Sequence, residues 1–161
     1  MKQKFIDLYM NWARSAAKLS HARRLQVGAV IVKDDTVISY GYNGMPAGWD
    51  NNCEDVLSTY DERDTHSMGD WQYDESTKKF SRLKTKPEVL HAEMNSLMKL
   101  AKSSSSGSQA SMFVTHSPCL DCAKGIHQAG IKRVFYQEDY RDSAGIEFLR
   151  RSNVEVTKYE A

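Results

Sequence analysis

The sequence has little of several features that mark whole classes of protein. Only 3 of its 161 residues are cysteines, so a fully paired set of intrachain disulfides is excluded and a reducing compartment, the cytoplasm, is expected. No apolar run approaches the length of about 20 residues that a membrane-spanning helix needs. The N-terminus reaches Asp7 and Asn11 too soon for a signal peptide.

Charge of one sign is also lacking, since 22 basic and 21 acidic side chains leave a formal net charge of +1. A protein that binds the phosphate backbone of long nucleic acid would show a strong basic excess. A chain of this length suits one domain, because about 150 residues can bury roughly 68–70% of their unfolded surface. We therefore expect a single globular domain over residues 1–161, without a membrane or long nucleic acid as its partner.

Hydrophobic periodicity predicts four helices and five strands. The helices are expected over residues 4–19, 88–102, 119–129 and 143–151, and the strands over 27–32, 36–42, 112–115, 133–136 and 154–156. The order α-β-β-α-β-α-β-α-β predicts an α/β fold with a five-stranded mixed sheet covered by helices on both faces, a three-layer α/β/α sandwich.

Residues 44–86 differ from the rest of the chain because they show little periodicity. So long a stretch is unusual in a compact domain unless it is a functional loop or lid. We interpret it as an insertion within the same domain that is partly ordered around Trp49 and Trp71, and in which Asp55–Asp61 could form a short helix.

Two short motifs carry the chemistry. His91-Ala92-Glu93 opens one predicted helix, and Pro118-Cys119-Leu120-Asp121-Cys122 lies where a predicted strand gives way to another helix. Together they match the H-x-E and P-C-x-x-C signature of zinc deaminases. A helix N-terminus stabilises the thiolate that binds zinc, and the two-residue gap lets both sulfurs reach one ion.

His91, Cys119 and Cys122 would be three ligands, which leaves the fourth tetrahedral position for water and marks a catalytic site. Zinc lowers the pKa of bound water from about 15.7 to about 7. Glu93 stands at a spacing that lets it reach this water as the acid and base without being a ligand. A redox-active or structural-zinc C-x-x-C is the alternative, but the preceding Pro118, the helix context and the lack of a second C-x-x-C speak against both.

Over most of its length the sequence resembles deoxycytidylate deaminases, including the bacteriophage type. The matching stretches are 26–31, 41–48, 91–95 and 113–124, of which Gly41-Tyr42-Asn43-Gly44 is the most discriminating. The resemblance implies the cytidine-deaminase-like fold and hydrolysis of dCMP to dUMP, which feeds thymidylate synthesis. It also implies one catalytic Zn²⁺, a homo-hexamer, activation by dCTP and inhibition by dTTP.

The same resemblance implies roles for individual residues. Asn43 matches a residue that hydrogen-bonds the sugar, Ala92 offers its backbone to the base, and Ser117 and Tyr140 match substrate contacts. Gly41, Tyr42, Asn43 and Gly44 resemble a segment tied to nucleotide regulation, although Asn43 by spacing alone reads as a turn residue. Arg23 and Arg24 could hold phosphate or form a solvated basic pair.

The sequence departs from the resemblance at one point. Phage-type relatives with a second, structural zinc have several cysteines around the segment where this chain keeps only Cys53, with His66 further along, so a second metal ion is doubtful. Two other functions stay open. One is a deaminase of the same fold for free cytidine, guanine or tRNA adenosine, and the other is a non-catalytic zinc-stabilised binding module.

Overall fold

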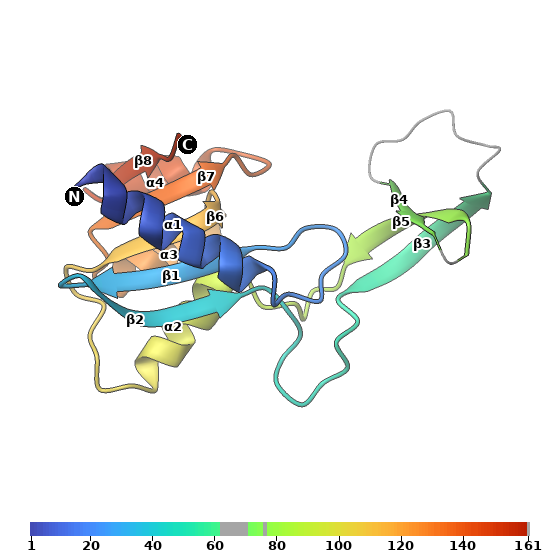
Figure 1. Ribbon diagram of the computed structural model, residues 1–161, viewed down its shortest axis with the longest axis horizontal. Coiled ribbons are helices and arrows are strands. Elements are labelled where there is room, and N and C mark those ends of the chain that lie inside the picture. Colours follow the sequence, from blue (N-terminus) through green and yellow to red (C-terminus); the bar gives the residue numbers. More distant parts are fainter. Residues whose placement is uncertain (62–70, 76, 161) are drawn as a thin grey trace.

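The computed structural model describes residues 1–61, 71–75 and 77–160, which form a main body and a projecting arm (Figure 1). The elements are α1 (Gln3–Ala17), β1 (Gly28–Lys33), β2 (Thr36–Tyr42), β3 (Glu54–Asp61), β4 (Trp71–Asp74), β5 (Lys79–Thr85), α2 (Ala92–Ala101), β6 (Ser111–His116), α3 (Leu120–Gln128), β7 (Arg133–Glu138), α4 (Ala144–Arg151) and β8 (Glu155–Lys158). The body is built on a sheet of order β2-β1-β6-β7-β8. In it β1 is antiparallel to β2 and β6, whereas β6, β7 and β8 are parallel, which confirms the predicted mixed sheet.

Helices cover both faces of this sheet because successive side chains of its central strands point to opposite faces and are apolar on both. Val30, Phe113 and Phe135 pack with Tyr9 and Met10 of α1 on one face. The other face packs against α2, α3 and α4 through Ala29, Ile31, Met112, Val114, Val134 and Leu149. The three-layer α/β/α arrangement is therefore confirmed (Figure 1). Within the described ranges no helix combines the length and apolar character needed to cross a membrane.

The segment expected to be an irregular insertion instead forms a second, three-stranded antiparallel sheet of order β3-β5-β4, which we call the arm. The short helix considered for Asp55–Asp61 is wrong, because this segment is strand β3. Pairing with β5 decides its conformation, as strand preference depends strongly on cross-strand neighbours. Trp49 does not organise the segment either, since it is 58% exposed.

Helix α2 begins four residues later than the periodicity predicts, and this later start puts His91 at the N-terminal end of the helix. Leu90 pairs with Gly44 through two backbone hydrogen bonds of 2.9 and 3.1 Å, so residues just before His91 are held extended. His91 is consequently the N-cap of α2, with φ −73° and ψ 152°. The backbone pairing of Gly44 with Leu90 thus determines that His91 is the N-cap residue of α2.

The strand directions bring the ends of β2, β6 and β7 to one edge of the main sheet, because these three strands run the same way. The chain leaves β2 at Asn43, leaves β6 at Ser117 and leaves β7 at Asp139, all at this edge. In open α/β sheets ligands bind outside the carboxyl ends of the strands. The fold therefore gathers the sequence-predicted residues at the position where a ligand site is expected.

Candidate active site

Two helix starts face each other at this edge and carry the three predicted ligands. His91 is the N-cap of α2, Cys119 is the N-cap of α3, and Cys122 lies in the first turn of α3. The Nδ1 atom of His91 lies 3.6 Å from the Cys119 sulfur and 3.5 Å from the Cys122 sulfur. In the part of the chain that is described, this is the only group of three or more His, Cys, Asp and Glu residues whose ligand atoms all lie within 4.8 Å of one another.

These separations fit a tetrahedral zinc ion. With Zn–S of about 2.3 Å and Zn–N of about 2.0–2.1 Å, tetrahedral angles place a sulfur and a nitrogen ligand about 3.6 Å apart. The observed separations of 3.5 and 3.6 Å match this value for both pairs. Two sulfurs and one imidazole are also a donor set that suits zinc. His91, Cys119 and Cys122 could therefore hold zinc with one coordination position left open.

Hydrogen bonds and burial around the two sulfurs change the pKa values of their thiols. Hydrogen bonds from Cys122 and His91 lower the pKa of Cys119 to about 4. The hydrogen bond with Cys119 in turn raises the pKa of His91 and, with burial, that of Cys122. Cys119 also stands at the N-terminus of α3, where free backbone N–H groups favour a thiolate. The lowered pKa of Cys119 thus favours the thiolate form, which is the form that binds a metal ion.

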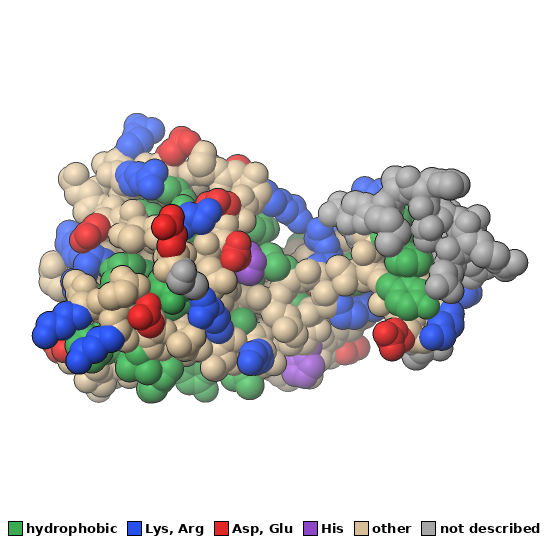
Figure 2. All heavy atoms as spheres, turned by 45° about the horizontal axis from the view of Figure 1, so that its top comes forward, with side chains coloured by type: hydrophobic (Ala, Val, Ile, Leu, Met, Phe, Trp, Pro, Cys, Tyr) green, Lys and Arg blue, Asp and Glu red, His purple; other side chains and the backbone are tan. Residues whose placement is uncertain are grey.

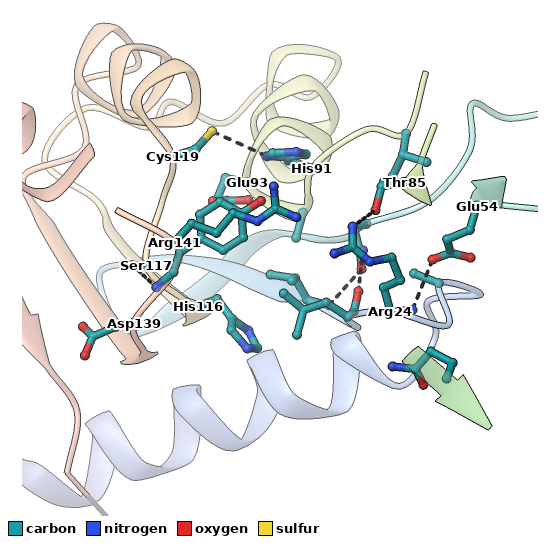
Figure 3. Close-up of a pocket in the computed structure, with 18 residues that line it drawn as sticks. Arg24, Glu54, Thr85, His91, Glu93, His116, Ser117, Cys119, Asp139 and Arg141 are labelled. Carbon is teal, nitrogen blue, oxygen red and sulfur yellow. Dashed lines mark hydrogen bonds between the residues drawn. The ribbon is translucent and has the colours of Figure 1, made fainter. Parts of the chain in front are cut away.

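Glu93 is placed beside these ligands but is not one of them. It lies in the first turn of α2, its side chain is 4% exposed, and it lines the cleft next to His91 (Figure 3). Burial raises the pKa of Glu93 to about 7. A carboxyl group with this pKa can both accept and donate a proton near neutral pH.

The backbone that carries Cys119 is held by α4. A Cβ atom on Gly145 would lie 2.0 Å from the Pro118 carbonyl oxygen and 2.9 Å from the backbone of Cys119. Only a residue without a side chain lets α4 approach this closely. Gly145 therefore helps to define the position of the first sulfur ligand.

Gly145→Ala is accordingly expected to destabilise the fold by about 1–3 kcal/mol, the usual cost of overpacking, and to weaken zinc binding. Denaturant unfolding and zinc titration would measure both effects. Gly44→Ala is the matched control, because a Cβ atom there would have no heavy atom within 4 Å. Equal stability of the two variants would contradict this role of Gly145.

All four predicted substrate contacts line one cleft of about 530 Å³ next to the cluster: Asn43, Ala92, Ser117 and Tyr140. The Asn43 amide accepts a hydrogen bond from Val27 N (2.8 Å) and donates one to Leu25 O (2.8 Å), so it is rigidly oriented. Ser117 Oγ accepts a hydrogen bond of 2.7 Å from the backbone N–H of Tyr140, and this bond connects the loops that follow β6 and β7.

The other residues of the predicted regulatory segment lie outside the cleft lining. Gly41 packs directly on α2, since a Cβ atom there would lie 2.3 Å from Ala92 O. Tyr42 accepts a hydrogen bond from Asn95 through its carbonyl oxygen at 2.7 Å. Gly44 forms the bridge with Leu90. Of the Gly41–Gly44 segment only Asn43 reaches the cleft.

The two adjacent arginines have different positions. Arg24 lines the cleft, whereas the Arg23 side chain is 50% exposed and forms an ion pair with Glu54, with 3.6 Å between Nε and Oε2. Arg141 and His116 also line the cleft and were not singled out from the sequence, although they adjoin Tyr140 and Ser117. Glu54, Gln72 and Thr85 of the arm reach the same cleft, and no sequence signal indicated this.

Cys53 lies away from the cluster. Its side chain is 1% exposed, and it packs with Ala22, Val89 and Met45 in a small core beside the arm. Burial raises the pKa of the Cys53 thiol, and the residue is a free cysteine, as the sequence favoured. His66, the other residue considered for a second metal, lies outside the described residues.

Comparisons with known proteins agree with this geometry. Residues 3–138 match the family described as the cytidine and deoxycytidylate deaminase zinc-binding region. The chain is 37% identical to the deoxycytidylate deaminase of Enterobacteria phage T4 over 150 residues, 81% of this chain and 77% of that one. It is 36% identical to the human deoxycytidylate deaminase over 146 residues, 85% and 71% of the two chains.

A solved structure extends the likeness to the full length. The dCMP deaminase of cyanophage S-TIM5, in complex with dCMP and dUMP, superposes with a TM-score of 0.79 at 38% identity and covers 99% of both chains. This agrees with the resemblance and the fold that the motifs predict. The zinc-binding motifs, the sheet order and these relatives together show that the chain belongs to the cytidine and deoxycytidylate deaminase family.

Proposed function

We propose that the chain is a zinc-dependent dCMP deaminase, which converts dCMP and water to dUMP and ammonia and so supplies dUMP for thymidylate synthesis. The observation that carries this proposal is the buried Glu93 beside the His91, Cys119 and Cys122 cluster in a cleft of about 530 Å³. Its support is the full-length likeness to a dCMP deaminase whose structure contains dCMP and dUMP.

In this proposal His91, Cys119 and Cys122 bind one catalytic zinc ion. When bound, zinc supplies a Lewis acid that lowers the pKa of a coordinated water to about 7. Glu93 takes one proton from the attacking water and gives it to the ring nitrogen, and it then moves the second proton of that water to the exocyclic amine. Oxygen is thereby bonded to C4 of the cytosine ring, the bond from C4 to the exocyclic nitrogen breaks, and ammonia leaves.

The remaining predicted residues would orient the nucleotide. The backbone N–H of Ala92 is at the N-terminus of α2, where such groups have no intrahelical partner, and can donate to the base. Asn43 uses one amide hydrogen and one oxygen lone pair within the protein, so its second amide hydrogen is available to a sugar hydroxyl. Ser117 accepts from Tyr140 and can still donate its own proton.

Basic side chains would hold the 5′-phosphate. Arg24 and Arg141 line the cleft, and Lys and Arg side chains gather where the arm meets the body (Figure 2). Guanidinium groups suit phosphate because their donors match its geometry. Among the basic pair of the sequence, we therefore assign Arg24 to the phosphate and leave Arg23 to its pairing with Glu54.

We also propose that the arm and the body form one deaminase domain, because Glu54 and Thr85 of the arm line the same cleft as Glu93. The family resemblance further supports a cytoplasmic homo-hexamer that dCTP activates and dTTP inhibits. Sedimentation would measure the hexamer. Adding dCTP and dTTP to a dCMP assay would measure the regulation, and a flat response to both would remove that part of the proposal.

Purified protein is expected to release ammonia from dCMP at least about 10-fold more efficiently than from deoxycytidine, since a phosphate adds one or more charge-assisted contacts. Parallel assays with dCTP, CMP, guanine and tRNA would test the other deaminase activities. Equal kcat/KM for dCMP and deoxycytidine would contradict the phosphate site. A protein that binds zinc but deaminates none of these would be the binding module instead.

A further inference from the structure

The end of the arm nearest the main body, where β3 begins and β5 ends, forms part of the cleft lining. Glu54 is the first residue of β3, and Thr85 stands directly opposite it as the last residue of β5. Both line the cleft of about 530 Å³ that holds Glu93 and His91. Figure 3 shows Arg24 between these two residues and the side of the cleft that carries Glu93.

Glu54 is buried and accepts hydrogen bonds from the backbone of the turn that carries Arg24. Its side chain is 1% exposed, and its Oε1 atom accepts the backbone N–H groups of Arg23 at 3.0 Å and of Arg24 at 3.2 Å. Two consecutive N–H groups held by one oxygen leave this turn little freedom. Glu54 therefore links the arm to the backbone from which the Arg24 side chain extends.

Thr85 holds the other end of Arg24. The Nη1 atom of the guanidinium donates to Thr85 Oγ1 at 3.2 Å. Because Glu54 and Thr85 are paired neighbours on two strands, Arg24 is held at its backbone and at its charged group by adjacent residues of the arm. Its guanidinium is thus pre-oriented toward the cleft before any ligand arrives.

The position of Glu54 is costly for stability. A buried carboxylate needs hydrogen bonds to offset its lost hydration, and its Oε2 atom has no hydrogen-bond partner, only the ion pair with Arg23 at 3.6 Å. Such under-satisfied buried groups are most readily explained where they serve a site.

We infer that Glu54 is a positioning residue that, with Thr85, aims Arg24 at the phosphate of the nucleotide, so that the arm contributes to selection of nucleotides over nucleosides. This rests on the proposed function, because it assumes that the cleft takes dCMP. Glu54 acts through Arg24 and does not itself touch the reacting atoms.

The test compares Glu54→Ala and Thr85→Val with wild type, using dCMP and deoxycytidine as substrates. Both variants are expected to raise the KM for dCMP by about 3- to 30-fold, the loss expected when one charged contact is misplaced, while kcat stays within about twofold. Activity on deoxycytidine, which lacks the phosphate, is expected to stay unchanged. Glu54→Gln keeps an acceptor for the two N–H groups and is expected to restore most of the affinity.

A double-mutant cycle separates positioning from general structural damage. In an Arg24→Met background, Glu54→Ala and Thr85→Val are expected to have no further effect on KM. Substitutions that act through the same group do not have additive effects. Arg23→Met, which removes the ion pair but keeps both backbone N–H groups, is the control and is expected to leave KM unchanged.

Two results would overturn the inference: additive effects of Glu54→Ala and Arg24→Met, or equal losses on dCMP and deoxycytidine. If Glu54→Ala does not fold, Thr85→Val and Glu54→Gln give the same comparison. A wild-type protein inactive on dCMP would refute the proposed function itself. A wild-type protein active on dCMP with unaffected Thr85 and Glu54 variants would refute only the role of the arm.

Discussion

Glu93→Gln is expected to lower kcat for dCMP by at least about 100-fold, the lower range for lost acid–base catalysis, while the protein still binds one zinc ion. The amide has nearly the same shape as the carboxylate but cannot take up a proton. Its site is buried, at 4% exposure, so solvent cannot easily replace it. Steady-state kinetics together with metal analysis of the same sample would measure both quantities.

The control for this variant is Glu88→Gln, which makes the same chemical change at an exposed position shortly before α2. It is expected to keep wild-type kcat. If Glu93→Gln stays active with zinc bound, Glu93 is not the proton carrier. If it loses zinc as well as activity, Glu93 supports the metal site and the proposed division between ligands and base is wrong.

Removal of the metal is the second change with a large expected effect. A strong chelator is expected to abolish deamination, and added Zn²⁺ is expected to restore it, because His91, Cys119 and Cys122 are the groups proposed to hold the ion. Cys122→Ser is expected to abolish stoichiometric zinc binding and activity together, since a hydroxyl group does not replace a thiolate as a zinc ligand.

Cys53→Ser is the matched control for the thiol substitution. Cys53 is buried in the small core beside Ala22 and Val89, away from the cluster, so its replacement is expected to leave zinc content and kcat unchanged. Metal analysis before and after dialysis against the chelator would measure this. Full activity of the metal-free protein, or loss of the catalytic zinc from Cys53→Ser, would contradict the assignment of ligands.

The sequence could predict the main sheet and the zinc motifs because both depend on local patterns. Buried strands such as β1 and β6 are continuous apolar runs, and the two-residue spacing of His91 and Glu93 is a local feature of the chain. The segment from 44 to 86 has no such pattern. Its strands β3 and β5 are stabilised by pairing with each other, from Glu54 with Thr85 to Asp61 with Lys79, so neither strand indicates its structure separately.

The sequence by itself determined which chemistry is present: two thiols and an imidazole at helix starts, with a carboxyl group beside them. Only the tertiary structure decided which of the remaining polar residues meet that chemistry. It turned Arg24 toward the cleft and Arg23 toward solvent, and it brought Glu54 and Thr85 to the same cleft from a separate sheet. The reason is physical: motif spacing acts over a few residues along one helix or turn, whereas these contacts depend on strand pairing and burial between distant segments.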